Sequence, residues 1–586
     1  MQSAETVLGV LRERGRRNLP CEELYRQLFN PQLYLLAYGR LYSNQGAMTP
    51  GATGETVDGM SLDKIGRVID ALRHKRFRWS PARRVYIPKK NGKRRPLGLP
   101  SWTDKLVAEV VRLLLEAYYE PTFSDASHGF RPGRGCHTAL RKIADTWQGT
   151  TWFVEGDIAD CFGSLDHDVM MTTLAANIRD GRFLRLIRHM LQAGYLEDWI
   201  FNATLSGSPQ GGVASPIMSN IYLDRLDTFI EKVLIPEYTR GRSRRPNREY
   251  HRVYYAMRRA HGRGDHAEFR KLRQRLRSLP SSDPQDPGYR RLRYIRYADD
   301  TLLGFIGPKA EAEEIKARLA QFLRDDLKLE LSPDKTLITY ARTRAARFLG
   351  YEITVQHSST KVTNGRRSVN GVIRLRVPIP VVNVYCSRYL KRGKPAHRSD
   401  LFAVPDRDIV RTYGAEYRGI VQYYLLASDV FRLSLLCWVM ETSLLKTLAG
   451  KHRSTVSTMA RKYRSKIDTP VGPRACLQVT TERPGRNPLV ARFGGIPLQR
   501  QRTALIIDKS TTRSVARRRE LVSRLLAGYC EVCGGTDGIA VHHVRSLTDL
   551  SERRQPHPAW VTVMLRKRRK ALVACRDCHT SIHADG

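Results

Sequence analysis

Two adjacent aspartates, Asp299 and Asp300, stand between two short apolar runs, and this feature constrains the fold more than any other. Residues 292–297 and 301–305 have the length and composition of β-strands, so the pair is predicted to lie at the turn of a hairpin. Neighbouring carboxylates repel each other unless a divalent cation neutralises them, and such oxygen ligands suit Mg²⁺. A solvated turn is the simpler alternative for an Asp-Asp pair taken alone.

A third aspartate, Asp157, ends another segment of strand character, residues 151–157. We expect Asp157 to face Asp299 across a small sheet, in an Mg²⁺ site formed by Asp157, Ile158, Asp299 and Asp300. Two Mg²⁺ ions shared by such carboxylates would clamp the attacking oxygen, the transferred phosphoryl group and the leaving pyrophosphate. Because phosphoryl transfer needs mainly positioning and charge neutralisation, these residues are sufficient for a nucleotide polymerase.

Several segments in succession resemble the blocks of a reverse transcriptase, and in particular of the multifunctional maturases encoded by mobile group II introns. They are residues 41–47, 87–100, 127–134, 151–162, 207–212, 297–300 and 347–351. The resemblance continues to the C-terminus and covers nearly the whole chain. It implies an α+β multidomain protein: a right-hand polymerase with fingers and an antiparallel palm sheet, an α-helical thumb (maturase domain X) and a small zinc-stabilised HNH domain of the ββα-metal type.

On this resemblance we divide the chain into five parts. They are an N-terminal extension with the start of the fingers (1–86), fingers and palm (87–365) with a basic insertion (239–291), the thumb (366–470), a basic DNA-binding segment (471–525) and the HNH domain (526–586). The pattern of residues 1–86 is mainly helical, residues 101–119 repeat apolar side chains at helical spacing, and residues 327–331 alternate like a strand.

The resemblance assigns further residues to the incoming nucleotide. Residues 87–100 are expected to form a basic hairpin, in which Arg95, and then Lys89 or Lys90, would grip the triphosphate. Ile158 belongs to the same nucleotide site, and Gln210 would contact the nucleotide from the opposite side.

Two more nucleotide-site assignments compete with ordinary structural roles. Phe162 would lie beneath the sugar, where its ring excludes a 2′-hydroxyl; the alternative is an ordinary core side chain. Lys335 matches the lysine near the leaving pyrophosphate, where an ammonium can donate a proton; the alternative is a solvated lysine in a turn.

Charge indicates that the partner is a polyanion. The chain has 100 Lys and Arg against 57 Asp and Glu, a formal charge of +43, far more than solubility requires. Nucleic acid is favoured over an anionic membrane, because no apolar run is long enough to span a bilayer and residues 1–20 lack a secretory signal. The arginine-rich insertion is either a solvated face or an RNA-binding arm that orders on assembly.

Four basic residues are predicted to contact phosphates without reading sequence. Arg131 and Arg134 lie in the glycine-rich loop 128–135, which the resemblance places beside template and primer. Lys451 and Arg461 lie near the end of the thumb-like helical region.

Two C-x-x-C pairs near the C-terminus, Cys530 with Cys533 and Cys575 with Cys578, predict a tetrahedral structural zinc site. Two unrelated pairs of reduced cysteines are the alternative. The other six cysteines are scattered singly, which suits buried thiols in a reducing cytosol better than a disulfide framework.

Four histidines surround the second cysteine pair. His542 and His543 are adjacent, and His579 and His583 are four residues apart on one helical face. The module resembles a zinc-supported HNH endonuclease, which makes His542, His579 and His583 ligands of the nuclease metal and His543 the general base. The asparagine that orients the base in this motif is not evident; Ala571 falls near its place.

These features predict a ribonucleoprotein enzyme that helps its group II intron RNA to fold and splice, nicks one strand of a double-stranded DNA target, and extends the released 3′-end with dNTPs by copying the RNA. Mg²⁺ would serve the polymerase and the nuclease, and Zn²⁺ would be structural. The expected location is the bacterial cytoplasm, in association with the nucleoid and with no membrane; monomer and homodimer both stay open. The alternatives are a maturase-only splicing cofactor and a reverse transcriptase used in defence or diversification.

Overall fold

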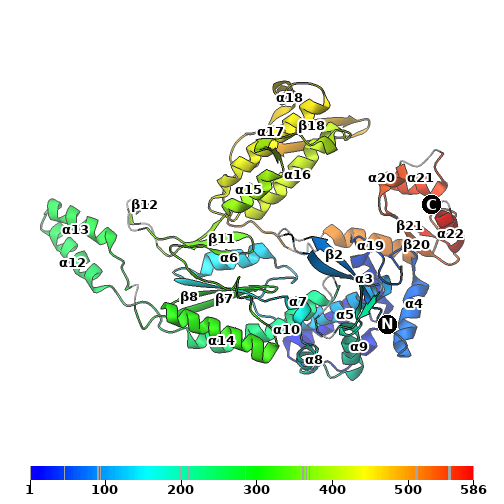
Figure 1. The fold of residues 1–586 in the computed structure, drawn as a ribbon, viewed down its shortest axis with the longest axis horizontal. Helices are drawn as coiled ribbons and strands as arrows, with labels where there is room; N and C mark the ends of the chain where they lie inside the picture. Colours follow the sequence, from blue (N-terminus) through cyan, green and yellow to red (C-terminus); the bar gives the residue numbers. More distant parts are fainter. Residues whose placement is uncertain are drawn as a thin grey trace.

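The protein, described here by a computed structural model, is a mixed α/β chain with several domains (Figure 1). The structure describes residues 2–44, 46–88, 92, 94–197, 200–204, 206–207, 212–283, 286–358, 362–363, 366–367, 370–507, 513–551 and 556–584. A large lower body contains the N-terminal and central sheets, a second lobe stands above it, and the C-terminal module lies at one end beside the N-terminal helices.

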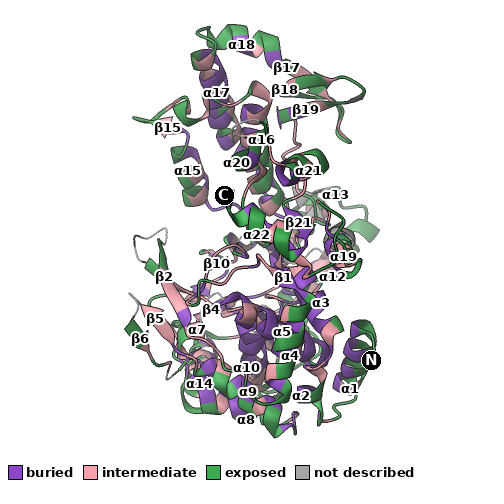
Figure 2. Ribbon diagram, turned by 90° about the vertical axis from the view of Figure 1, so that its right-hand side faces the viewer, coloured by how far each residue is buried: buried purple, intermediate pink, exposed green. Residues whose placement is uncertain are grey.

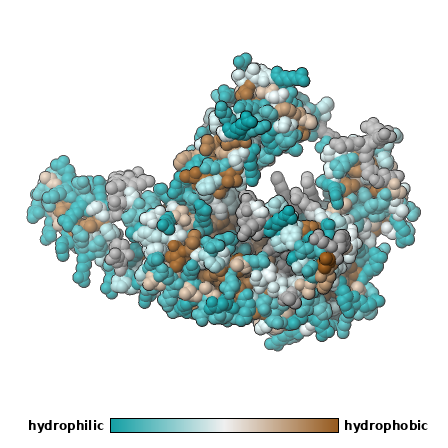
Figure 3. Space-filling view, viewed as in Figure 1, coloured by the Kyte–Doolittle hydropathy of each residue, from teal (hydrophilic) through white to brown (hydrophobic). Residues whose placement is uncertain are grey.

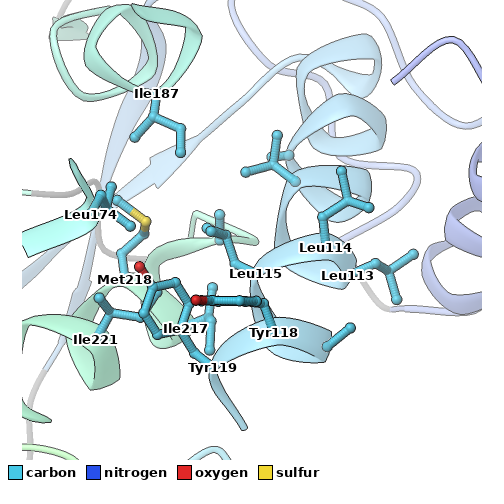
Figure 4. Close-up of a cluster of buried hydrophobic side chains, with 14 of the residues drawn as sticks. Leu113, Leu114, Leu115, Tyr118, Tyr119, Leu174, Ile187, Ile217, Met218 and Ile221 are labelled. Atoms are coloured by element: carbon cyan, nitrogen blue, oxygen red, sulfur yellow. The ribbon is translucent and has the colours of Figure 1, made fainter. Parts of the chain in front are cut away.

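A helical core organises the lower body. Helix α5 (Trp102–Tyr119) confirms the prediction for residues 101–119, and it starts where the Ser101 hydroxyl accepts a hydrogen bond from the main-chain N–H of Asp104. Its aliphatic and aromatic side chains pack against those of three helices from later in the chain (Figure 4). Each fully buried aliphatic side chain stabilises the fold by about 1.5–3 kcal/mol. Helices α5 and α10 are buried along most of their length (Figure 2).

The other elements of this part of the body are mostly helical. They are α1 (Ala4–Arg16), α2 (Leu24–Gln27), α3 (Pro31–Leu41), β1 (Met60–Ser61), α4 (Leu62–Arg73), α6 (Cys136–Thr146), α7 (Cys161–Ser164), α8 (His167–Ala175), α9 (Gly181–Leu191), α10 (Ser215–Phe229), the π-helix η1 (Ile230–Leu234) and α11 (Ile235–Glu237).

The central sheet is antiparallel and has the order β7-β8-β4-β9. Its strands are β4 (Trp152–Asp157), β7 (Arg291–Tyr297), β8 (Asp300–Ile306) and β9 (Ile338–Tyr340). The predicted hairpin and the predicted strand before Asp157 are both confirmed. Helix α6 lies on one side of this sheet, and α14 (Lys309–Leu327) lies on the other (Figure 1).

Residues 327–331 do not form the predicted strand. Leu327 is the last residue of α14, and Lys328 ends that helix in the left-handed conformation with φ of 51°. The alternating leucines pack into the core from a helix end and a loop, so their spacing does not report a pleated strand.

The basic hairpin is confirmed and begins earlier than predicted. Strands β2 (Ala82–Pro88) and β3 (Arg94–Leu99) are antiparallel, and β2 also pairs in parallel with β5 (Tyr195–Glu197), which pairs with β6 (Ile200–Asn202). Gly92, between the arms, has φ of 78°, which favours glycine.

The basic insertion forms a projecting helical hairpin at one end of the molecule (Figure 1). It consists of α12 (Arg248–Gly262) and α13 (His266–Ser278), which meet at Gly264 with φ of 72°. None of the side chains of α13 is buried in the described structure, and the visible surface of the arm is strongly hydrophilic (Figure 3).

The upper lobe combines small sheets with four α-helices. Its elements are β10 (Ala346–Phe348), β11 (Tyr351–Val355), β12 (Val362–Thr363), β13 (Arg366–Arg367), β14 (Ile373–Arg376), α15 (Ile379–Ser387), β15 (Leu390–Lys391), β16 (Lys394–Pro395), η2 (Ser399–Leu401), α16 (Asp406–Tyr424), η3 (Val430–Leu433), α17 (Ser434–Lys451) and α18 (Val456–Tyr463). The helices α15–α18 agree with the α-helical character expected for residues 366–470.

This lobe also contains a three-stranded sheet, which the sequence did not predict and most of which follows residue 470. Strands β17 (Arg464–Ile467), β18 (Arg474–Arg483) and β19 (Arg486–Gly494) are antiparallel neighbours. A Cβ on Gly414 of α16 would lie only 2.1 Å from the carbonyl oxygen of Arg492, so the helix packs closely on β19. The predicted boundary between residues 470 and 471 therefore falls inside one packed unit.

The C-terminal module has a ββα arrangement. It contains α19 (Arg513–Leu526), β20 (Ala540–His543), α20 (Leu547–Ser551), α21 (Ala559–Lys567), β21 (Ala571–Ala574) and α22 (Arg576–Ala584). Strands β20 and β21 are antiparallel, and α22 follows β21 directly. The N-terminal strand β1 pairs with β20 and completes a sheet of order β1-β20-β21.

Candidate active sites and metal centres

The aspartates meet at one end of the central sheet. The strand register pairs Asp157 directly with Asp300, while Asp299 occupies the turn between β7 and β8. The expectation that Asp157 faces Asp299 is thus off by one residue. Ala298 enters the turn with φ of 55°, a left-handed conformation that is strained for alanine. Such strain persists only where the surroundings hold the turn in place.

A buried ion pair stabilises that turn. Arg296 is fully buried and donates to Asp227, with Nη2 and Oδ2 2.6 Å apart. Its Nη1 also donates to the carbonyl of Ala298 at 2.9 Å, and the Tyr294 hydroxyl donates to Asp227 at 2.7 Å. Breaking such a pair costs about 3–5 kcal/mol, because one charge is left buried alone. This network fixes the turn, and sequence reasoning missed it.

The loop of residues 127–134 packs against the same turn. The main-chain N–H of His128 donates to the carbonyl of Arg296 at 2.9 Å. A Cβ on Gly129 would lie 2.3 Å from the nitrogen of Ala298, so only glycine fits at this contact.

Burial and the charges of neighbouring carboxylates oppose the ionisation of Asp299 and Asp300. The pKa of Asp300 is raised to about 6, by burial first and then by the charges of Asp299 and Asp157. Burial also raises the pKa of Asp299, and the charge of Asp157 adds to this. Lys335 Nζ lies 2.8 Å from Asp157 Oδ2, so an ammonium already neutralises one member. The site therefore favours bound cations. Carboxylate oxygens are ligands that Mg²⁺ prefers.

The three carboxylates do not converge on a single point. In the described residues, only two groups bring three or more ligand atoms within 4.8 Å of one another, and neither contains any of these three aspartates. The aspartate arrangement suits ions that keep water and substrate oxygens among their ligands better than one closed protein cage.

Some of the predicted nucleotide-site residues are described. Arg95 lies on β3, close enough for its charge to act on the ionisation of Asp299. Phe162 is half-buried on α7, with its ring edge-to-face with Phe130 at a centroid distance of 6.4 Å, so it is not a core side chain. Ile158 follows β4 directly and is buried. Lys89, Lys90 and Gln210 lie outside the described residues.

Two predicted phosphate contacts need correction. Arg131 is 2% exposed, and its guanidinium is occupied by Glu120 and by main-chain carbonyls of the same loop, so it holds the loop together and is not presented to a phosphate. Lys451 Nζ is paired with Asp406 Oδ1 at 2.9 Å and joins two helices of the upper lobe. Both positions look basic in the sequence, but in the folded protein each is paired with a carboxylate, that of Glu120 or of Asp406.

The other two predicted phosphate contacts stay predictions. Arg134 is half-buried, with Nη2 2.6 Å from Asp125 Oδ1, and that carboxylate is itself largely exposed. Arg461 is exposed on α18.

The four cysteines of the C-terminal module form a compact cluster that could hold a zinc ion. All four sulfur atoms lie within 4.8 Å of one another, and those of Cys533 and Cys575 are 3.6 Å apart. Main-chain N–H groups of Val532 and Cys533 point to the sulfur of Cys530. Burial opposes ionisation of Cys530, yet hydrogen bonds from these N–H groups, from the N–H of Cys575 and from the Cys533 thiol outweigh it and lower its pKa to about 7, which favours the thiolate that a metal needs.

A second cluster contains three of the predicted histidines and one unpredicted residue. His542 on β20 and His579 and His583 on α22 are joined by Asp58, which precedes β1 at the other end of the chain. Asp58 Oδ2 lies 2.7 Å from His583 Nε2. The sequence offers no signal for this residue, because it is a single aspartate more than 480 residues away from its partners.

His543 points away from that cluster. Its ring is 5% exposed, and its Nε2 is hydrogen-bonded to the Tyr38 hydroxyl at 2.9 Å. Ala571 is the direct cross-strand partner of His543, so no side chain from this position can orient the imidazole. Burial lowers the pKa of His543 to about 4, which keeps the imidazole neutral, as a general base must be.

No helix in the described part of the chain is both long and apolar enough to cross a bilayer.

Comparison with known families places three domains on the chain. Residues 87–353 match reverse transcriptase (RNA-dependent DNA polymerase), residues 381–472 match type II intron maturase, and residues 530–579 match the AI2M/AI1M-like HNH endonuclease. These matches follow the order that the sequence motifs predicted.

Individual relatives span the whole arrangement. The chain is 37% identical over 583 residues to the group II intron-encoded protein LtrA of Lactococcus lactis subsp. cremoris, an alignment that covers 95% of each protein. It is 33% identical over 580 residues to an uncharacterized 91 kDa protein in a cob intron of Schizosaccharomyces pombe, covering 96% of this chain and 70% of that protein. The chain therefore belongs to the group II intron-encoded proteins: it is a multifunctional reverse transcriptase that also carries an intron maturase domain and an HNH DNA endonuclease domain.

Proposed function

We propose that Asp157, Asp299 and Asp300 form the catalytic centre of the polymerase and hold two Mg²⁺ ions. The observation that carries this proposal is the register of the central sheet, which pairs Asp157 with Asp300 beside a turn that buried contacts hold in a strained conformation. When bound, Mg²⁺ would neutralise the phosphates and activate the attacking 3′-hydroxyl. The raised pKa of Asp300 supports the proposal, because a cation relieves the cost of ionising buried neighbouring carboxylates.

Two basic side chains would act on the phosphates. Lys335, now paired with Asp157, could turn to the leaving pyrophosphate and donate a proton once metal ions neutralise the aspartates. Arg95 would grip the triphosphate from the β2–β3 hairpin, which acts as the fingers. On this proposal the central sheet is the palm, and the lobe built on α15–α18 is the thumb.

Phe162→Ala or Phe162→Val should let the enzyme incorporate ribonucleotides. The half-buried ring packs edge-to-face against Phe130, and removing it would open space for a 2′-hydroxyl. A lost steric clash of this size changes selectivity by about 10–200-fold. The measurement compares rNTP with dNTP incorporation on one primed RNA template, with Phe201→Ala as a control at an exposed aromatic of the same region. Unchanged discrimination in both Phe162 variants would exclude this ring from the sugar site.

Several surfaces suit an RNA partner. A cavity of about 740 Å³ lies between the β10-β11-β14 sheet and η3, and its lining includes arginines at positions 342, 344, 374, 376 and 432. Asp429 pairs with Arg376 and Arg432, which leaves the other three arginines to make the cavity basic. The α12–α13 arm adds a second basic surface, and the protein is hollowed between the upper lobe and the C-terminal module (Figure 3).

We assign these surfaces to the intron RNA and to its hybrid with the growing DNA. Guanidinium groups in a cavity bind phosphate oxygens by paired hydrogen bonds, and shape-directed RNA recognition relies on such backbone contacts. The double-stranded DNA target would meet the HNH domain, which lies at the far side of the hollow.

A further inference from the structure

The N-terminal segment that carries Asp58 is fixed on the nuclease sheet. Met60 and Ser61 of β1 pair with Val541 and Ala540 of β20, and the N–H of Gly59 donates to the carbonyl of Val541 at 3.0 Å. Asp58 directly precedes Gly59, so this pairing brings it beside both His542 and His543. The contact is therefore built by main-chain pairing, and it does not depend on one flexible side chain.

The carboxylate of Asp58 meets three imidazoles at once. Its Oδ1 is 3.2 Å from His542 Nδ1, and its Oδ2 is 3.6 Å from His579 Nε2 and 2.7 Å from His583 Nε2. The main-chain N–H of His543 donates to Oδ1 at 2.7 Å and fixes the carboxylate. One ligand atom from each of the four side chains lies within 4.8 Å of the other three.

Two of these nitrogens are buried without a hydrogen bond. His542 Nδ1 and His579 Nε2 satisfy hydrogen-bond geometry with no described residue, although both approach Asp58. A buried polar atom without a partner is costly and calls for an unplaced water or ion. Nitrogen atoms that converge on a common centre, and do not bond to one another, are what a metal ion requires.

We propose that Asp58 is a fourth protein ligand of the nuclease metal, so that one ion clamps the N-terminal region onto the HNH domain and closes the nuclease site. Three imidazoles and one carboxylate suit a four-coordinate transition-metal ion such as Zn²⁺ better than the Mg²⁺ that the sequence led us to expect for the nuclease, because Mg²⁺ prefers oxygen ligands in octahedral geometry. Catalytic sites of this kind keep one position open for water or substrate, whereas a site with four protein ligands is closed. The scissile phosphate has to displace Asp58 before the metal can assist cleavage.

The same docking covers the general base. His543 is buried against the N-terminal helix α3, where Tyr38 holds its Nε2 and the Tyr42 ring lies 6.0 Å from its own ring. Separation of β1 and α3 from β20 would open the metal position and expose His543 together. The closed arrangement thus prevents nicking until DNA or RNA binding moves the N-terminal region.

This inference rests on the assignment of His542, His579 and His583 to the nuclease metal, so the test separates the two. Full-length protein that retains one equivalent of zinc on the cysteine cluster is titrated with Co²⁺, whose visible absorption is strong in four-coordinate sites and weak in six-coordinate ones. The proteins compared are wild type, Asp58→Ala, Asp58→Asn, His583→Ala and the control Asp63→Ala, which removes an exposed aspartate from α4.

We expect wild type and Asp63→Ala to give the strong four-coordinate spectrum. Asp58→Ala should give a weaker spectrum and bind Co²⁺ more weakly by at least the ~10-fold typical of losing a supporting partner. Hydrogen exchange at residues 58–61 and 540–543 should become faster in Asp58→Ala. Asp58→Asn, which keeps the shape, should show the same direction, and primer extension by each variant verifies that the protein is folded.

Each contrary result has a definite meaning. If both Asp58 variants keep the wild-type spectrum and Co²⁺ affinity while His583→Ala loses them, Asp58 is not a ligand and the proposal fails, although the nuclease metal assignment stands. If His583→Ala also behaves as wild type, the nuclease assignment fails together with the proposal. Nicking of target DNA by Asp58→Ala should be at least as fast as by wild type; slower nicking with normal metal content would contradict a closed state.

Discussion

Replacing Asp299 or Asp157 by alanine will abolish cDNA synthesis from a primed RNA template and leave RNA binding largely intact. Both carboxylates belong to the site where β4, β7 and β8 meet, and neither contributes positive charge that could hold RNA. Groups that stabilise charge in phosphoryl transfer act on a scale of about 10³–10⁵-fold in rate, so the loss should be of that order or larger.

The matched control for these variants is Asp334→Ala, which removes an exposed aspartate next to Lys335. It should extend primers nearly as well as wild type, because it alters neither the sheet nor the turn. Primer extension and RNA binding are measured on the same preparations. Wild-type extension by either Asp157→Ala or Asp299→Ala would remove these residues from the catalytic centre.

Substitution of Cys575 by serine and of His543 by alanine should both eliminate DNA nicking, but for different reasons. Cys575 is a buried member of the four-sulfur cluster, and zinc binding at such clusters supplies about 10–16 kcal/mol in small zinc-finger peptides. Cys575→Ser should therefore contain less zinc and unfold locally. His543→Ala should keep its zinc and lose only the general base.

Metal analysis, hydrogen exchange of residues 526–584 and a nicking assay separate these outcomes. Both variants should still extend a supplied primer, because the aspartate site lies on another domain, and His557→Ala serves as a control histidine outside both clusters. Full zinc content in Cys575→Ser would contradict the zinc assignment. Wild-type nicking by His543→Ala would show that another group is the base.

Local sequence patterns predicted the parts of the polymerase site that are themselves local. The Asp-Asp pair between apolar runs predicted the β7–β8 hairpin, and the composition of residues 151–157 predicted the strand that ends at Asp157. The partner register was missed by one residue, since it depends on pairing between strands more than 140 residues apart. The ion pair of Arg296 with Asp227 could not be predicted either, because its partners are also far apart in the sequence.

Other predictions failed because a partner in the folded protein changes the role that a residue's sequence context suggests. Arg131 looked like a phosphate ligand until Glu120 proved to neutralise it within the fold. The buried side chains of β18 are the two neighbours Cys476 and Leu477, and they do not alternate with exposed ones, so this strand was not predicted.

In the C-terminal module, too, local features were predicted and a long-range contact was not. The spacing of the two C-x-x-C pairs identified the four cysteines, and the resemblance to a zinc-supported HNH endonuclease identified the three histidines. Asp58 lies at the opposite end of the chain, and only the pairing of β1 with β20 brings it to the histidines.

The most direct test of the account follows one DNA strand through both active sites. Protein assembled with its intron RNA is mixed with double-stranded target DNA labelled on the strand to be nicked, with and without dNTPs. Wild type should first produce the nicked strand and then, only with dNTPs, a longer product whose added sequence is complementary to the RNA. Asp157→Ala should accumulate the nicked strand without extending it. Extension of the nicked strand by Asp157→Ala, or nicked ends that wild type never extends, would contradict the claim that the two sites act in succession on one DNA strand.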